Sequence, residues 1–98
     1  MTTERLYEFL ILAQTLSYSK AAKKLFVTQA TLSRHVIEME QTLGISLLDR
    51  TTHGVRLTEA GKVLMHSAAD ILRQSDAANA RLRLADVQAA GTVAVACS

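Results

Sequence analysis

The spacing of hydrophobic positions predicts a mainly helical chain, and its most informative stretch runs from Thr28 to Leu43. Apolar side chains recur there at intervals of three and four, which places them on one face of a helix. They are Leu32, Val36, Met39 and Leu43. Thr28 is a suitable N-cap, and Gly44 permits the positive φ at which a helix commonly ends. We therefore expect one helix over 28–43.

Two shorter helices are expected before this segment. The first is capped by Thr3 and runs to about Leu16, with one apolar face turned to the core. That face consists of Leu6, Phe9, Leu10, Ala13 and Leu16. The second begins after Ser19, whose hydroxyl can accept an amide hydrogen, and runs to Leu25. A joint of few residues then leads into the helix over 28–43, which is the spacing of a helix-turn-helix.

The segment after this helix changes character, because short aliphatic runs replace the helical spacing. Residues 45–50 and 55–57 are compatible with two strands, and residues 51–54 with the turn between them. Two short strands and a basic turn at this place would make a wing. Thr58 can cap the next helix, with Glu59 in the first turn, where the helix dipole favours an acid.

The last helix has no stop signal before Gly91, so we expect it to run over 58–90. Its apolar positions repeat weakly every seven residues, as in a coiled coil. So small a domain cannot cover the apolar face of a helix this long, and a second copy is the simplest partner. A solvated helix that tethers a further domain is the alternative. The expected dimer-interface residues are Leu64, Ala68, Ile71, Ala78 and Leu82.

Positive charge is concentrated around the helix over 28–43. Between residues 20 and 56, six basic residues stand against three acidic ones, a local excess of +3 in a chain of formal net charge +2. A basic surface of this kind suits phosphate binding, although an ordinary solvated surface can have the same composition. Lys20, Lys23 and Lys24 are accordingly either a solvated face or phosphate contacts.

The sequence gives little support for an enzyme or for a metal-binding protein. Cys97 is the only cysteine, which excludes an intrachain disulfide, and the three histidines lack the spacing of a metal site. No serine has a partnered histidine and aspartate, so we do not expect an enzyme. No apolar run approaches the roughly 20 residues of a membrane span, and no leader is visible. A cytoplasmic protein without a cofactor in this region is expected.

The chain closely resembles the N-terminal DNA-binding region of LysR-type transcriptional regulators over about its first 65 residues. The matching segments are Phe9, Ser17 to Leu25, Val27 to Gln29, Ser33-Arg34, Glu40, Leu43-Gly44, Leu47-Leu48, Arg50-Thr51 and Leu57 to Gly61. The resemblance implies a winged helix-turn-helix of three helices and a two-stranded wing over 1–57. A dimerising linker helix would follow over 58–90. Residues 91–98 would be a hinge and the first strand of a truncated domain that binds a small-molecule effector.

The resemblance also implies that the helix over 28–43 is a recognition helix in the major groove. Its early residues would touch bases and phosphates, and these are Thr28, Gln29, Ala30, Thr31, Ser33 and Arg34. Gln29 can offer a bidentate amide to adenine, and the methyl groups of Ala30 and Thr31 can meet a thymine methyl. Ser33 and Arg34 suit backbone phosphates, and Arg34 can also reach a guanine.

The wing over 50–56 would lie on the minor groove and the DNA backbone. Its expected contacts are Arg50, Thr51, His53 and Arg56. The family carries a basic side chain at the wing tip, a place that His53 takes here, so protonation would strengthen this contact. Arg50 could instead pair with Asp49 or Glu59. His35, beside Arg34, could contact DNA or polar neighbours within the chain.

We therefore expect sequence-specific binding of double-stranded DNA by a homodimer that controls transcription in the bacterial nucleoid. A tetramer is a further option for the full-length protein. One rival is a winged helix that serves protein assembly without touching DNA. That rival predicts acidic or apolar residues at positions 29, 33 and 34, where the sequence has Gln, Ser and Arg. The other rival, an enzyme, lacks a cluster of catalytic groups.

Overall fold

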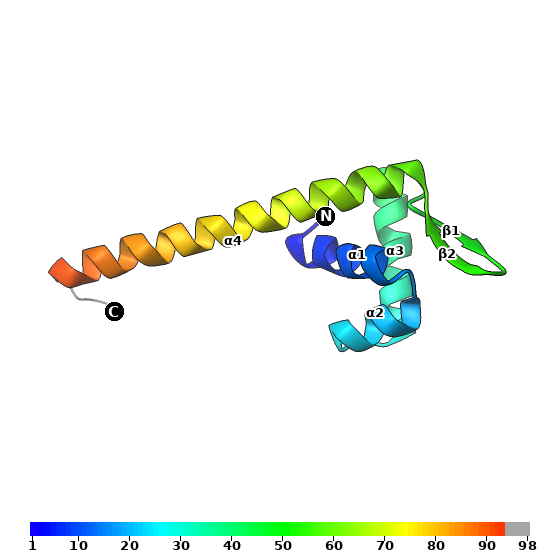
Figure 1. Ribbon diagram of the computed structural model, residues 1–98, viewed down its shortest axis with the longest axis horizontal. Coiled ribbons are helices and arrows are strands. Elements are labelled where there is room, and N and C mark those ends of the chain that lie inside the picture. Colours follow the sequence, from blue (N-terminus) through cyan, green and yellow to red (C-terminus); the bar gives the residue numbers. More distant parts are fainter. Residues whose placement is uncertain (94–98) are drawn as a thin grey trace.

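The computed structural model describes the backbone of residues 1–93 and the side chains of residues 1–87. In chain order its elements are α1 (Thr3–Thr15), α2 (Tyr18–Leu25), α3 (Gln29–Leu43), β1 (Leu48–Thr51), β2 (Gly54–Leu57) and α4 (Glu59–Val93). Figure 1 shows α1 and one end of α3 beside the first turns of α4, with α2 on the far side of α1, the two strands projecting at one end and α4 extending in the opposite direction. The fold is the winged helix-turn-helix with a long helix that the sequence predicts.

α2 is capped by Ser17 and not by the predicted Ser19. Leu16 ends α1 in the left-handed conformation with a φ of 51°, and Ser17 then takes an extended conformation. The Ser17 hydroxyl oxygen accepts the N–H of Lys20 at 3.2 Å, whereas Ser19 already lies within the first helical turn. α1 is likewise capped one residue earlier than predicted, by Thr2.

The joint between α2 and α3 is the tight turn that the sequence predicts, and it forms without glycine. Phe26 adopts the left-handed conformation there, with a φ of 58°, and its side chain is 94% exposed. The N–H of Val27 donates to the carbonyl oxygen of Ala22 at 3.1 Å. Thr28 then caps α3 by accepting the N–H of Thr31 at 3.0 Å. These bonds set the direction in which α3 leaves the turn.

The core lies between the first three helices and the base of the wing. Its buried residues are Phe9, Leu12, Ala13, Ala21, Ala22, Leu32, Val36, Met39, Leu47 and Leu48. Leu12 is fully buried although it lies outside the predicted face of α1, because α1 packs against α2, α3 and α4 at once. Leu16 and Leu43, which the spacing predicts to be buried, are 42% and 39% exposed. Both lie at helix ends, where the chain turns away from the core.

The wing is a two-stranded antiparallel sheet in which β1 pairs with β2. Thr51 lies opposite Gly54, so the turn consists of residues 52–53 and is shorter than the predicted 51–54. Gly54 has a φ of 121°, which only glycine adopts readily. The strands therefore reach closer to the wing tip than the sequence predicts.

The base of the wing is tied to α3 through the carboxylate of Glu40. One carboxylate oxygen accepts the backbone N–H of Leu47 at 2.7 Å and that of Leu48 at 3.2 Å. It also accepts the hydroxyl of Ser46 at 3.4 Å. Because Leu47 and Leu48 are buried, this carboxylate satisfies amides that would otherwise lack a partner.

The start of α4 is fixed against the same part of the wing. Thr58 caps α4 as predicted, since its hydroxyl oxygen accepts the N–H of Gly61 at 3.0 Å and its O–H donates to the carbonyl oxygen of Ser46 at 2.7 Å. A Cβ added to Gly61 would lie 2.2 Å from the carbonyl oxygen of Leu47. Glycine at position 61 thus permits the close approach of α4 to the wing base.

α4 packs on the body only through its first turns. Leu64 is partly buried against the core, and Ala68 is 0% exposed. Ala68 is therefore inaccessible to a second copy, and its assignment to the dimer interface is wrong, because α1 packs against α4 within one chain. The helix continues through Gly91 to Val93, past its expected end at residue 90. The rest of the strand expected after Gly91 lies outside the described residues.

Within the part of the chain that is described, no helix combines the length and the apolar character that a membrane crossing requires.

Candidate nucleic-acid interface

The N-terminal half of α3 turns polar side chains away from the core. Thr28, Gln29, Ala30 and Arg34 are exposed, and Thr31 and Ser33 are partly exposed. Leu32 and Val36 of the same helix are buried in the core, and this fixes the rotation of α3 about its axis. The hydroxyls of Thr28 and Thr31 are hydrogen-bonded to each other at 2.9 Å. All six residues that the sequence predicts on this helix are thus at least partly exposed to solvent.

The wing adds the four further residues that the sequence predicts. Arg50, Thr51, His53 and Arg56 are all exposed. The hydroxyl of Thr51 donates to the carbonyl oxygen of Gly54 at 3.2 Å and accepts the N–H of His53 at 3.2 Å. Thr51 is therefore engaged in shaping the turn that carries His53. Arg56 lies opposite Asp49 in the register of the sheet.

Arg50 joins the wing to the two preceding helices. One terminal nitrogen of its guanidinium donates to the hydroxyl oxygen of Tyr18 at 3.1 Å and to that of Ser33 at 3.1 Å. The guanidinium carbon lies 4.9 Å from the centre of the Tyr18 ring, which is a cation–π distance. The alternative partners Asp49 and Glu59 form no ion pair with Arg50 among the described side chains.

Tyr18 is the member of this cluster that sequence reasoning misses. It begins α2, 32 residues before Arg50, and no spacing rule connects the two positions. Burial raises the pKa of Tyr18 above its ordinary value of 10.0, an effect that the nearby Arg50 opposes and Glu40 adds to. The phenol therefore stays protonated at neutral pH, and its O–H remains a hydrogen-bond donor.

His35 is used within the chain. Its Nδ1 lies 2.9 Å from a carboxylate oxygen of Glu8, and both side chains are mostly buried. A terminal nitrogen of Arg5 lies 3.7 Å from the same oxygen. Of the two roles that the sequence leaves open for His35, the structure therefore supports the contact with polar neighbours, which links α1 to α3.

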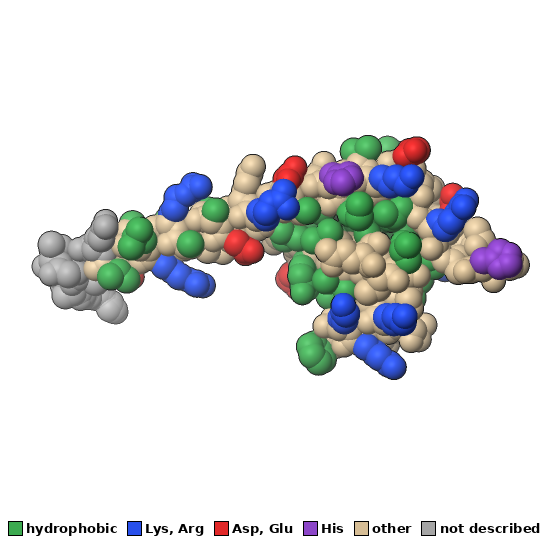
Figure 2. Space-filling view, in the orientation of Figure 1, with side chains coloured by type: hydrophobic (Ala, Val, Ile, Leu, Met, Phe, Trp, Pro, Cys, Tyr) green, Lys and Arg blue, Asp and Glu red, His purple; other side chains and the backbone are tan. Residues whose placement is uncertain are grey.

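Basic side chains extend the polar face of α3 to both sides. Lys20, Lys23 and Lys24 are exposed on α2, and none forms an ion pair among the described side chains. Figure 2 shows Lys and Arg side chains gathered over α2 and around the base of the wing. The sequence has no acidic residue between Glu8 and Glu38. α2 and the N-terminal half of α3 therefore carry basic side chains without an acidic one, whereas on the wing Arg56 lies opposite Asp49.

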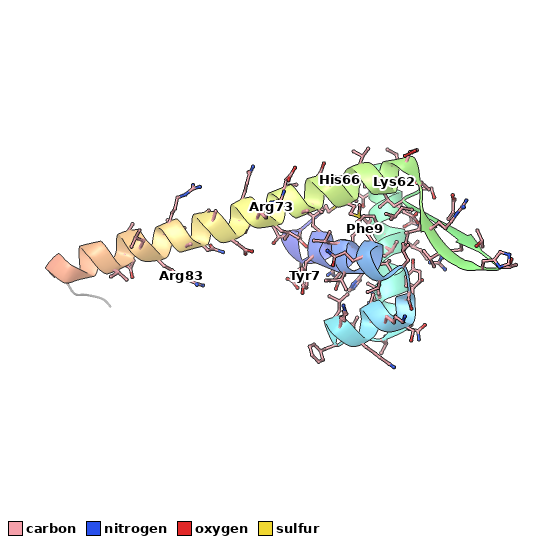
Figure 3. The ribbon with its side chains drawn as sticks, in the orientation of Figure 1. Tyr7, Phe9, Lys62, His66, Arg73 and Arg83 are labelled. Carbon is pink, nitrogen blue, oxygen red and sulfur yellow. The ribbon has the colours of Figure 1, made fainter. Side chains whose placement is uncertain are left out.

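The projecting part of α4 carries apolar side chains that its own body does not cover. Ile71 is 43% exposed and Leu82 is 67% exposed, and Ala78 between them is also exposed. Leu84 and Val87, which are not among the predicted interface residues, are 60% and 66% exposed. Arg73 and Arg83 also project from this helix (Figure 3).

Comparisons with known proteins agree with this geometry. The family model described as "Bacterial regulatory helix-turn-helix protein, lysR family" matches residues 3–62. The HTH-type transcriptional regulator YbhD of Escherichia coli is 38% identical over 89 residues, which are 91% of this chain and 28% of that protein. The chain thus spans little more than a quarter of the length of this relative.

Solved structures give the same result. The crystal structure of CbnR, a LysR family transcriptional regulator, matches with a TM-score of 0.83 and 32% identity, over 88% of this chain and 30% of that one. The CbnR_DBD–DNA complex matches with a TM-score of 0.82 and 33% identity, over 87% of this chain and 98% of that one. Together with the wing, the tight turn and the polar face of α3, these matches show that the chain belongs to the lysR family of bacterial regulatory helix-turn-helix proteins.

Proposed function

We propose that the chain binds double-stranded DNA in a sequence-specific manner, as a homodimer, and thereby regulates transcription. The observation that carries this proposal is the contact between Arg50 of the wing and Ser33 of α3 at 3.1 Å. It connects the wing and the N-terminal half of α3 into one surface that bears Arg34 and Arg50. A surface of this kind suits a helix in the major groove and a wing on the adjacent backbone. The CbnR_DBD structure, solved as a DNA complex, supports this assignment.

Within this surface we assign base contacts to the first turn of α3. Gln29 presents an amide that can hydrogen-bond adenine, and the methyl groups of Ala30 and Thr31 suit a thymine methyl. Phosphate contacts are assigned to side chains that flank this turn and to the wing. They are Thr28, Ser33, Arg34, Arg50, Thr51, His53 and Arg56.

The dimer would form through the exposed apolar residues of α4. Leu82, Leu84 and Val87 are 67%, 60% and 66% exposed on a helix that projects away from the body, and a group of exposed apolar side chains marks an interaction site. Replacement of Leu82 by Asp should shift the chain toward monomer in sedimentation equilibrium. Arg83→Ala is the matched control, because Arg83 is a charged neighbour on the same turn, and it should leave the association unchanged.

The whole protein has further expected properties that we also propose. We place it in the cytoplasm at the nucleoid, with a regulatory role and no catalytic one. A small-molecule effector would bind outside the region described, in the remaining length that relatives such as YbhD have. Assembly of the full-length protein could extend the dimer to a tetramer.

The direct test is selection of bound sequences from a pool of random DNA duplexes. A dimer of this geometry should recover an inverted repeat, because two-fold symmetry in the protein is matched in its site. Gln29→Ala should change the recovered sequence, whereas Arg34→Ala should weaken binding to most sequences. With about six phosphates contacted, affinity should fall roughly 10³-fold between 50 and 200 mM salt. Recovery of no sequence, with no salt-sensitive binding to any duplex, would refute the proposal.

A further inference from the structure

Tyr18, Ser33 and Arg50 come from three different elements and meet at one point. Tyr18 is the first residue of α2, Ser33 lies in the second turn of α3, and Arg50 lies in β1. Both hydroxyl oxygens lie 3.1 Å from the same guanidinium nitrogen, Nη2. The Tyr18 ring lies against the guanidinium, so the side chain of Arg50 is held on two sides.

The hydrogen bonds within this cluster leave some of its N–H and O–H donors unused. A guanidinium has five N–H donors, of which two are on Nη2. Both of these are used by Tyr18 and Ser33, so Nη1 and Nε of Arg50 keep three N–H groups. Each hydroxyl accepts one of these bonds and keeps its own O–H as a donor. The cluster therefore offers several donors and one positive charge to an acceptor that it does not itself contain.

The carboxylates nearest in the sequence are directed elsewhere. Asp49 precedes Arg50 in β1, so its side chain lies on the opposite face of the sheet, and its cross-strand partner is Arg56. Glu40 is engaged by the amides of Leu47 and Leu48. An arginine that is positioned by neutral groups, without a carboxylate partner, keeps its full charge for an anion.

We propose that Tyr18 is a positioning residue for DNA binding, whose hydroxyl and ring hold Arg50 so that Arg50 and Ser33 bind one backbone phosphate together. This inference rests on the proposed function. It adds to it a residue, Tyr18, that orients the phosphate-binding side chain at the junction of α3 and the wing. One phosphate held from both elements fixes the angle between the recognition helix and the wing on the duplex. Tyr18 acts through Arg50, because the guanidinium supplies the charge that holds the phosphate.

A double-mutant cycle on DNA affinity tests this inference with the sequence recovered by selection. Tyr18→Phe keeps the ring that packs in the fold and removes only the hydroxyl. It should weaken binding about 5- to 10-fold, within the range for the loss of one ordinary hydrogen bond. Arg50→Ala should weaken binding at least about 10-fold and reduce the slope of log affinity against log salt by about 0.9, which corresponds to one phosphate. When Arg50 is already Ala, Tyr18→Phe should cost less than about 2-fold, because the two changes remove one contact.

Tyr7→Phe is the matched control, because Tyr7 is an exposed tyrosine of α1 that lies on the side away from the wing (Figure 3). It should leave DNA affinity unchanged. Ser33→Ala in the same cycle provides a second variant that also keeps the fold. Equal affinity and equal salt slope for Tyr18→Phe and the wild type would overturn the inference while the proposed function stands. So would a Tyr18→Phe effect that is just as large without Arg50. Failure of the wild type to bind any duplex would instead overturn the proposed function, and this inference with it.

Discussion

Replacement of Glu40 by Ala should loosen the wing from α3. The carboxylate accepts two backbone N–H groups, at 2.7 Å from Leu47 and 3.2 Å from Leu48, and both residues are at most 7% exposed. A buried donor left without a partner costs about 1–3 kcal/mol, and partial access of water to the loop places each amide near the lower end. The exposed hydroxyl of Ser46, at 3.4 Å, adds little. The expected loss is about 2–3 kcal/mol of unfolding free energy.

For a domain of this size, each kcal/mol lowers the melting temperature by about 4–8 °C, so Glu40→Ala should melt about 10–20 °C below the wild type. Circular dichroism during a thermal scan measures this directly. Glu38→Ala is the matched control, since Glu38 is an exposed acid on the same helix without an ion pair among the described side chains. Glu40→Gln should lie between the two, because the amide keeps one acceptor oxygen. Melting temperatures for Glu40→Ala and Glu38→Ala that agree within about 2 °C would refute the reasoning.

Three further changes probe other features. Gly61→Ala should destabilise the fold by about 3 kcal/mol in a urea titration, because the added Cβ meets the carbonyl oxygen of Leu47. A loss of unfolding free energy below about 1 kcal/mol would contradict the close approach of α4 to the wing base. Phe26→Gly should raise the melting temperature by several degrees, because it relieves the strain of about 1 kcal/mol that a side chain carries in the left-handed conformation. The side chain that it removes is 94% exposed. A lower melting temperature would show that Phe26 makes a stabilising contact. His53→Ala should weaken DNA binding modestly in fluorescence anisotropy titrations at constant pH and salt, because it removes the polar side chain at the wing tip; an unchanged affinity would remove His53 from the interface.

Local rules account for most of the fold. Thr28 and Thr58 cap their helices as predicted, and Gly44 ends α3 with a φ of 67°. The cap of α2 was displaced from Ser19 to Ser17, because the left-handed conformation of Leu16 decides where the helix can begin. A leucine in that conformation gives no sequence signal, since glycine is the residue that usually marks it.

Contacts between distant segments account for what local rules do not predict. Ala68 fits the heptad spacing of α4 but is buried by α1, because the first turns of α4 pack on their own body. The same holds at the site, where all ten expected residues are at least partly exposed but the partners of Arg50 could not be named. Tyr18 and Ser33 lie 32 and 17 residues from Arg50 along the chain, and only the packing of α2, α3 and β1 brings them together.

The mass of the protein–DNA complex tests the central claim most directly. Sedimentation equilibrium with a duplex that carries the selected inverted repeat should give two chains per duplex, and raising the salt from 50 to 200 mM should dissociate the complex. A single chain that stays monomeric at high concentration and leaves the duplex free at the lower salt would contradict the account.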